Sequence, residues 1–412
     1  MLAATASGGL GPSNTGSTSL EERELYFELG GPAYRLMKRI GVIKGAGPCV
    51  FRRSVLFIWI AWLPLLVLTT LEGHAFGPTP RSGFLLDLTT YARFFLGVPL
   101  IFAAEAVVGP QMRSAGLRFL HAGIVRPESE ADFTAAVNRV RRLREAYLPE
   151  VVFLIVALCA PWFLSLERLT GLGATSWRTS VVEGRVHLSM AGMWYNFVSV
   201  PLVQFFVLRW LWRLIVWTLF LWKVSRLDLN LLATHADGAG GLGFLGTAHV
   251  SMAIFPFAIG CVLAAEVAFR IKFEGLSLYD LQSMIPLLIA YLALVECLTF
   301  GPLMIFISPL ARVRLEALRT YGILVQRHNQ LFHEKWIQGG RSADESPLGS
   351  PDMSSLIDLG SSFAVIKDMN VVPVRASQLI RVAIITCLPV LPLLFLSLPF
   401  MDVVKLLASV VR

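Results

Sequence analysis

Long runs of apolar residues alternate with shorter charged stretches along the chain. A membrane-spanning helix needs about 20 consecutive, mainly apolar residues. Segments of this kind recur about seven times, and they predict an all-α fold, a polytopic transmembrane helical bundle with little or no sheet. The predicted spans are Ser54–Leu71, Leu88–Val108, Pro149–Leu166, Met190–Trp222, Thr247–Phe269, Leu281–Pro309 and Leu379–Phe400.

The fourth predicted span, Met190–Trp222, is too long for one crossing, because a helix rises about 1.5 Å per residue. We expect its first part, to about Leu208, to cross the membrane. The second part carries Arg209 and Arg213, so we expect it to emerge into the cytoplasmic interface. Its tryptophans would then lie between lipid and water, where amphipathic rings are favoured.

The remaining segments are more polar and predict how the chain is organised around the bundle. Residues 1–19 are rich in Ala, Gly, Ser and Thr without charge, which is typical of a disordered tail. Three cytoplasmic loops are expected to be helical and to form a cap, with a linker at Gly339–Pro351. The predicted order is tail 1–19, cytoplasmic segment 20–53, bundle 54–400 with loops 109–148, 209–246 and 310–378, and amphipathic tail 401–412.

Composition agrees with this pattern and excludes a soluble protein. Of 412 residues, 55% are apolar and only 16% are charged, whereas soluble domains carry about 25% charged residues. The lipid bilayer must therefore be a partner. The net charge of +8 is explained by Lys and Arg in alternate loops, since cytoplasmic loops collect them. This bias predicts a cytoplasmic N-terminus, a periplasmic C-terminus and no nucleic-acid partner.

Known motifs of catalysis, metal binding and cofactor binding do not occur in the sequence. The five cysteines are scattered and form no close pair, so neither disulfides nor a zinc site is indicated. His328 and His333 are five residues apart, which is not the helical spacing of a zinc pair. We therefore expect no metal and no cofactor, and we assign no catalytic residue.

Ionisable residues inside predicted spans are the first candidates for function, because charge in lipid is expensive. Arg93 and Glu266 have matching depths and are expected to pair, either as a structural ion pair or at a substrate site. Glu105 is near the cytoplasmic end of its span, where it can reach the interface. Glu296 is near the middle of the sixth span, so it must pair, face water or be protonated.

A glycine-rich stretch before the fifth span is the second candidate site. It contains His235 and Asp237, followed by Gly238, Gly240 and Gly241. Glycines at the start of a helix leave N–H groups that can hold an anion. Together with Arg209 and Arg213, this loop is a candidate binding site. The alternative is a tight structural turn between two helices, since no standard phosphate-loop spacing is matched.

Several short motifs resemble a family of uncharacterised bacterial multi-pass inner-membrane proteins. They include Arg209-Trp-Leu-Trp-Arg213, Ser225-Arg-Leu-Asp-Leu229 and His235-Ala-Asp-Gly-Ala-Gly-Gly-Leu242. The resemblance covers most of the chain from about Arg93, although the family usually has proline where this chain has Ala236. It implies a location in the bacterial inner membrane and brings no established activity.

Three functions fit these features. The first is a channel or transporter for an ion or small solute, favoured by Glu296, the Arg93–Glu266 depth match and the many prolines inside spans. The second is a signalling or assembly protein whose cytoplasmic cap binds a protein partner, or which forms a homo-oligomer. The third is a membrane-embedded enzyme that uses His235 and Asp237. We favour the first and expect the chain not to be an enzyme.

Overall fold

The computed structural model describes residues 30–43, 47, 49–77, 82–163, 176–182, 185–273, 284–340, 342, 345–346 and 349–393. The predicted tails, residues 1–19 and 401–412, lie outside the described residues. The ends of the third and seventh predicted spans also lie outside them.

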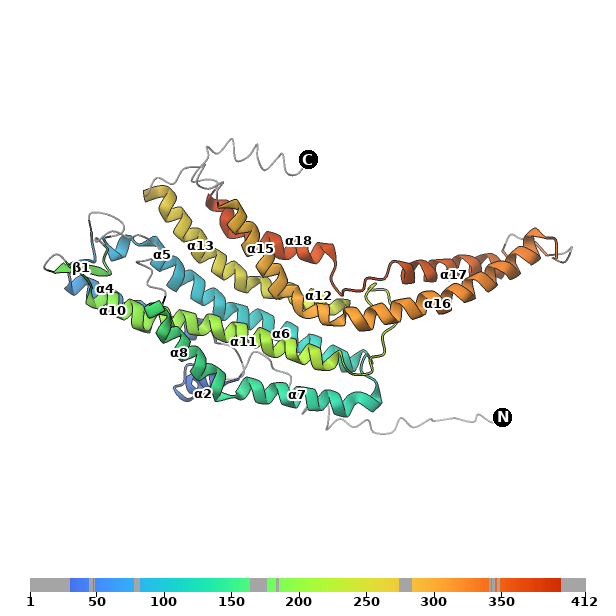
Figure 1. The fold of residues 1–412 in the computed structure, drawn as a ribbon, viewed down its shortest axis with the longest axis horizontal. Helices are drawn as coiled ribbons and strands as arrows, with labels where there is room; N and C mark the ends of the chain where they lie inside the picture. Colours follow the sequence, from blue (N-terminus) through green and yellow to red (C-terminus); the bar gives the residue numbers. More distant parts are fainter. Residues whose placement is uncertain are drawn as a thin grey trace, which may run out of the picture.

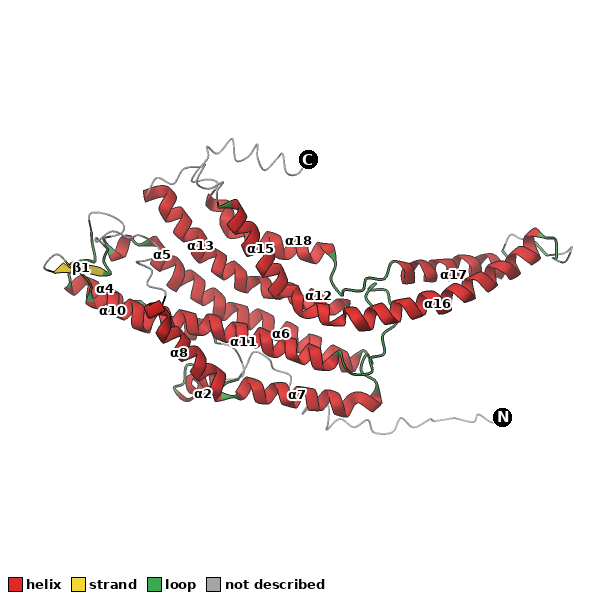
Figure 2. Cartoon of the chain, in the orientation of Figure 1, coloured by secondary structure: helices red, strands yellow, loops and turns green. Residues whose placement is uncertain are grey.

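The described chain is almost entirely helical (Figure 2), as the sequence predicts. Strands β1 (Thr179–Val182) and β2 (Arg185–Leu188) form a small antiparallel hairpin in which Thr179 pairs with Leu188. The helices are α2 (Pro32–Arg39), α3 (Val50–Ala61), α4 (Leu63–Leu71), η1 (Phe84–Leu86), α5 (Leu88–Tyr91), η2 (Ala92–Gly97), α6 (Val98–His121), η3 (Pro127–Ser129), α7 (Glu130–Glu145), α8 (Tyr147–Phe163), α10 (Met190–Trp194), η4 (Tyr195–Ser199), α11 (Val200–Val224), α12 (Gly243–Val250), η5 (Ser251–Ala253), α13 (Ile254–Phe273), α15 (Ile285–Phe300), η6 (Gly301–Phe306), α16 (Ile307–Phe332), η7 (His333–Ile337), α17 (Pro351–Lys367), α18 (Ala376–Cys387) and η8 (Leu388–Val390).

Within the part of the chain that the structure describes, consecutive elements join into six helices that are long and apolar enough to cross a membrane. They are Val50–Leu71, Leu88–His121, Met190–Val224, Gly243–Phe273, Ile285–Ile337 and Ala376–Leu393. The chain is therefore a multi-pass membrane protein. The third predicted span corresponds to α8, whose described part has 17 residues. Val151, Leu154 and Ile155 on α8 are about half exposed, which suits a helix that faces lipid.

Two long helices contain a π-helical turn that ends two residues before a proline. Segment η2 precedes Pro99, and η4 precedes Pro201. Proline removes a backbone donor inside a helix, and a π-turn takes up the resulting irregularity without ending the helix. Each helix can therefore continue for more than 30 residues.

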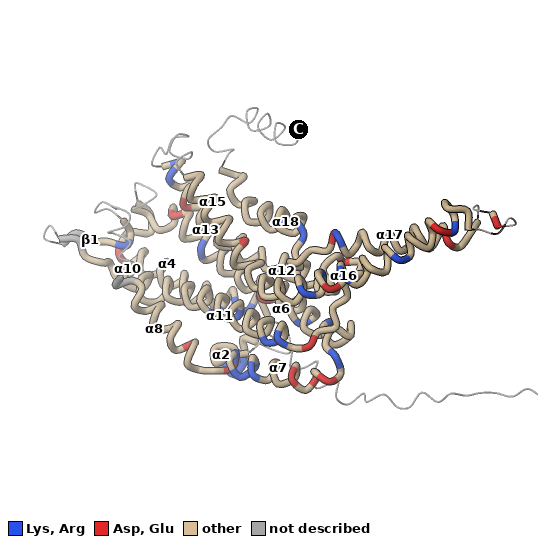
Figure 3. The backbone as a smooth tube through the Cα atoms, turned by 45° about the vertical axis from the view of Figure 1, so that its right-hand side comes forward, with Lys and Arg blue, Asp and Glu red and all other residues tan. Residues whose placement is uncertain are grey.

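The long helices run along one direction and define two ends (Figure 1). The β1–β2 hairpin lies at one end, which we call the hairpin end. Helices α7 and α12 lie toward the other end, which we call the arm end. There α16 continues out of the bundle and packs along α17, and we call this pair of helices the arm. Charged residues are frequent on α7 and the arm, whereas α4, α8 and α15 carry very few (Figure 3).

Aromatic side chains fill the centre of the bundle. Toward the middle, the ring of Phe57 contacts those of Phe94, Phe102 and Phe206, so α3, α6 and α11 are joined. A second group, centred on Phe119, lies nearer the arm end. These buried rings hold the helices that carry the charged residues described next.

Candidate functional site: a buried charge cluster

Glu105 on α6 bridges two arginines from two other helices. Its Oε2 atom accepts a hydrogen bond of 2.5 Å from Nη1 of Arg53 on α3, and its Oε1 atom forms an ion pair with Arg213 on α11. Glu105 is only 5% exposed. The guanidinium of Arg53 also lies over the ring of Phe102. The side chain of Glu105 is thus enclosed by helices and paired with two arginines.

Arg209 extends this arrangement by one turn of α11. Its Nε atom donates to Oε1 of Glu150 on α8 at 3.1 Å, and its Nη2 atom donates to the carbonyl of Gly30 at 2.8 Å. Glu150 also accepts the N–H of Ala33 at 2.6 Å, at the start of α2. A side chain at Gly31 would meet Glu150, because a Cβ atom there would lie 2.5 Å from its Oε1. The glycine therefore allows the carboxylate to reach α2.

We call these five residues, Arg53, Glu105, Glu150, Arg209 and Arg213, the charge cluster. They come from α3, α6, α8 and α11, and Arg209 interacts electrostatically with three of the others in addition to Glu150's direct bond. Arg209 is 2% exposed, so its side chain is enclosed within the protein. Arg213 is largely buried as well.

Two guanidinium donors of the cluster have no acceptor among the described residues. Nη1 of Arg209 and Nη2 of Arg213 are shielded from solvent and donate to no described atom. A buried donor without an acceptor costs about 1–3 kcal/mol, and more when it is charged. Both donors therefore add an unfavourable contribution to the free energy of folding, as far as the described residues show.

One small cavity is lined by two residues of the cluster, and a second cavity shares part of its wall. The first, about 40 Å³, is lined by Glu105 and Arg213 together with apolar residues of α6, α11 and η5. The second, about 80 Å³, lies between α11, α13 and α15. Trp210, Leu214 and Met252 line both cavities, so the same three side chains separate them.

Glu296 lies on α15, near the second cavity. Val295 and Thr299 line that cavity, while Glu296 itself does not. Both carboxylate oxygens are shielded from solvent, and no described residue donates a hydrogen bond to them. No pairing partner is found for this carboxylate among the described residues.

Arg93 and Glu266 lie on helices that pack together, because η2 contacts α13. They are close enough to interact electrostatically. The direct partner of Glu266 is, however, Arg270, one turn along α13 at 3.1 Å. Arg93 lies over the ring of Tyr195. The two residues thus lie near each other, as the sequence predicts, but each makes its direct contact with another residue.

The glycine-rich loop is closed by its own aspartate. Asp237 accepts the N–H groups of Ala239, Gly241 and Gly243 at 2.8, 3.1 and 2.7 Å. Burial raises the pKa of Asp237, but these hydrogen bonds outweigh it, so the net pKa is lowered from 3.8. His235 lies 2.9 Å from Asp237 and is exposed. In this structure the carboxylate occupies the N–H groups that were expected to hold an external anion.

Three glycines of this loop have a positive φ angle, a conformation that favours glycine. Gly238, Gly240 and Gly241 have φ of 65°, 64° and 96°, which other residues rarely adopt. Arg209 and Arg213, grouped with this loop in the sequence, belong instead to the charge cluster. The loop therefore has the geometry of the structural turn that was the alternative.

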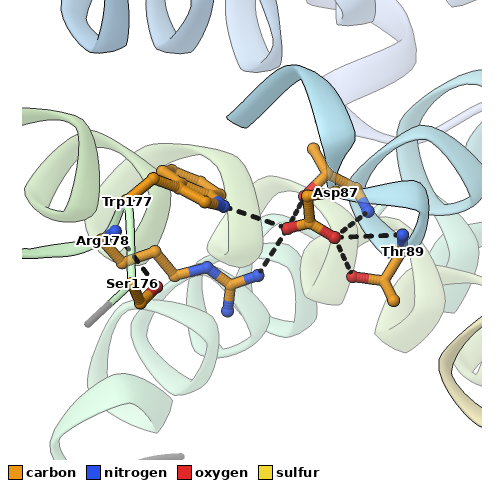
Figure 4. Close-up of polar contacts among 6 residues, drawn as sticks. Asp87, Thr89, Ser176, Trp177 and Arg178 are labelled. Carbon is orange, nitrogen blue, oxygen red and sulfur yellow. Dashed lines mark hydrogen bonds and ion pairs between the residues drawn. The ribbon is translucent and has the colours of Figure 1, made fainter. Parts of the chain in front are cut away.

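A polar network at the hairpin end was not predicted. Asp87 accepts hydrogen bonds from Thr89, from Nε1 of Trp177 at 3.1 Å and from Arg178 at 3.2 Å (Figure 4). Trp177 is 1% exposed. Burial raises the pKa of Asp87, but Arg178 and the hydrogen bonds lower it below 3.8. All of these donors are side chains of the protein itself, and Trp177 and Arg178 directly precede β1. The network therefore links the hairpin to the bundle.

Sequence reasoning missed Arg53 and Glu150 because both lie at the edges of apolar runs. Charged residues at the end of an apolar run usually reach water, so neither residue was predicted to be functional. One signal was present: Arg53 and Glu150 lie at the same side of the membrane as Glu105 and Arg209 in the predicted topology. Charges of opposite sign at one depth can pair across helices.

Two further results concern ligands and relatives. Among the described residues, no group of three His, Cys, Asp or Glu side chains is arranged to hold a metal ion. Comparisons of the chain with protein-family models, curated proteins and solved structures gave no match.

Proposed function

We propose that this membrane protein is a channel or transporter for an ion or small solute, and that the charge cluster is the site where the solute binds or is gated. One observation carries the proposal: Glu105 and Arg213 of the buried cluster line a cavity that shares three lining residues with a second cavity. Buried charges in membrane helices commonly mark solute pathways. A purely structural pair would need no adjacent space.

The proposed route starts at the first cavity, beside Arg213, and passes the shared wall of Trp210, Leu214 and Met252. Rotation of these side chains would join the two cavities, since nothing else is common to their linings. The second cavity reaches the turn of α15 that carries Glu296. Glu296 does not line the cavity itself, and we propose that it affects the solute through this turn of the helix.

Flux into reconstituted vesicles tests the proposal. We expect the full chain to move at least one solute from a panel of inorganic ions and small metabolites. Arg213→Gln should reduce that flux at least about tenfold, as loss of one buried hydrogen-bonded charge usually does, and Glu296→Gln should alter it. Arg118→Gln is the matched control, because Arg118 is an exposed arginine over Phe244. Absence of flux throughout the panel would refute the proposal.

We further propose that the protein lies in a bacterial inner membrane with seven crossings, α8 supplying the seventh. An odd number places the N-terminus in the cytoplasm and the C-terminus in the periplasm, as the loop charges favour. The arm end would then be cytoplasmic, forming a cap. Reporter fusions at the two termini test the orientation: signals on the same side would contradict seven crossings.

The arm favours a second candidate function, recruitment of a cytoplasmic protein or formation of a homo-oligomer. Its two helices leave large apolar side chains exposed, among them Ile323, Leu331 and Ile357. Pull-down from native membranes should recover a stoichiometric partner that is lost when these residues become serine. Recovery of a homo-oligomer alone would count against the recruitment of another protein.

A further inference from the structure

We propose that α2 lies in the surface of the bilayer and binds negatively charged phospholipid headgroups through Lys38 and Arg39. This inference does not depend on transport, but it rests on α8 facing lipid, as the proposed seventh crossing requires. The juxtaposition behind it is specific. Two exposed basic side chains and two exposed apolar side chains share one short helix, and that helix is attached to the first turn of α8.

The sequence of α2 separates apolar from basic side chains. Leu36 and Ile40 are four residues apart and so lie on one face of the helix, while Lys38 points to the opposite side. Met37 packs against the core of the protein, whereas Leu36 and Ile40 are more than half exposed. A helix with an apolar face and a basic face is typical of segments that lie in a membrane interface.

The basic side chains at the end of α2 are available to a ligand from outside. Lys38 and Arg39 belong to its last turn, are exposed, and form no ion pair with a described residue. Arg35, one turn earlier, is instead used within the protein. It donates to the carbonyl of Glu145 at 3.3 Å and lies over the ring of Tyr147. Lys38 and Arg39 can therefore attract the negative phosphate of a lipid headgroup.

The charge cluster fixes the first turn of α2 against the bundle. Glu150 accepts the N–H of Ala33, and Arg209 donates to the carbonyl of Gly30. The helix is thus held beside the start of α8 (Figure 1). Its last turn, which carries Lys38, is left on the outside of the protein.

The start of α8 has the side chains of a membrane boundary. Tyr147 and Leu148 are largely exposed in its first turn, and the exposed apolar side chains of the helix follow them. Tyrosine is enriched where acyl chains meet headgroups. Because α2 contacts this turn, it lies at the level of the headgroups when α8 faces lipid.

The apolar side chains distinguish a bilayer from a soluble anion. Free phosphate could neutralise Lys38 and Arg39, but it would leave Leu36 and Ile40 exposed to water. A bilayer of acidic phospholipid offers apolar chains and negative charge at neighbouring depths. The observed combination therefore fits the lipid surface better.

Hydrogen exchange of the full chain in lipid nanodiscs tests the inference. Phosphatidylcholine alone is compared with an equal mixture of phosphatidylcholine and phosphatidylglycerol. We expect the amides of residues 36–40 to exchange at least about fivefold more slowly in the mixture, since one basic side chain near an acidic surface contributes about that factor. Lys38→Gln with Arg39→Gln should remove the difference. Arg319→Gln with Arg327→Gln, two exposed arginines of α16, is the matched control and should keep it.

Two further arms identify the ligand. Leu36→Gln with Ile40→Gln should speed exchange of α2 in both lipids, because glutamine forms helices as well as leucine does but does not insert into acyl chains. Inorganic phosphate added to phosphatidylcholine nanodiscs should leave the exchange unchanged. Slower exchange with phosphate would show that the ligand is a soluble anion and would refute the lipid site.

The remaining outcomes separate this inference from the proposed function. Equal exchange of α2 in both lipids would overturn it, as would a lipid effect that persists without Lys38 and Arg39. Unchanged exchange without Leu36 and Ile40 would show that α2 is not inserted. Slower exchange in the acidic lipid without flux of any solute would support the lipid site and refute transport. Flux with equal exchange in both lipids would do the reverse.

Discussion

Glu150 on α8 accepts a 3.1 Å hydrogen bond from Arg209 on α11, and both side chains are buried. Glu150→Ala leaves the guanidinium of Arg209 without its carboxylate. Breaking a buried pair in this way usually costs about 3–5 kcal/mol. We therefore expect a clearly lower midpoint when the purified protein is denatured by heat or by SDS.

The double variant Glu150→Leu with Arg209→Met supplies the control. It removes both charges and keeps side chains of similar size, so much of the lost stability should return. If Glu150→Ala were as stable as the unchanged protein, the pair would not bind α8 to α11.

Asp237 should make the structure of its loop depend on pH. Its folded pKa is lowered, so its contribution is present above 3.8 and is lost as pH falls through the folded value. Hydrogen exchange checks this: the amides of Ala239, Gly241 and Gly243 should stay protected near neutral pH and lose protection in acid. Asp237→Ala should lose the protection at all pH values. Retained protection in that variant would show that the carboxylate does not close the loop.

Asp87→Ala should loosen the hairpin end, because Trp177 and Arg178 lose a shared buried acceptor. We expect faster hydrogen exchange in residues 176–178 and 187–189 and a loss of stability of about 3 kcal/mol. Asp87→Asn keeps one acceptor oxygen and should be milder. Asp132→Asn on α7 is exposed and serves as the control. An effect of Asp87→Ala spread evenly over the bundle would contradict local fastening.

Glu296→Leu should raise stability. Its carboxylate is shielded, with no hydrogen-bond donor among the described residues, so replacement by an apolar side chain removes an unfavourable burial. The melting temperature in detergent should increase, while Thr299→Val, a change on the same helix, should have little effect. A decrease for Glu296→Leu would reveal a stabilising partner of the carboxylate.

The helices of this chain could be predicted because apolar periodicity reports them locally. The predicted Ser54–Leu71 and observed Val50–Leu71 differ at one end only. The charge cluster could not be predicted in the same way. Arg53 and Glu105 are 52 residues apart, and Arg209 and Glu150 are 59 apart, so their contact depends on which helices pack together. That information lies in tertiary structure and not in any local pattern.

The sequence also suggested an open anion site at the glycine-rich loop, because free N–H groups are common at a helix start. The structure places Asp237 there. A carboxylate two residues before the first of these donors can turn back and bond to them, which is the local hydrogen bonding typical of aspartate. Asp237 was one reason to regard the loop as a ligand site, and its carboxylate occupies the N–H groups that a ligand would need.

The helix from Ile285 to Ile337 is continuous over 53 residues, about 80 Å at the usual rise. This helix runs through the bundle and on into the arm as one element. Its 3₁₀-helical segment, η6, contains the buried Leu303 and Phe306 and packs against α11. The helix that carries Arg209 and Arg213 is therefore in direct contact with the element that forms one half of the arm.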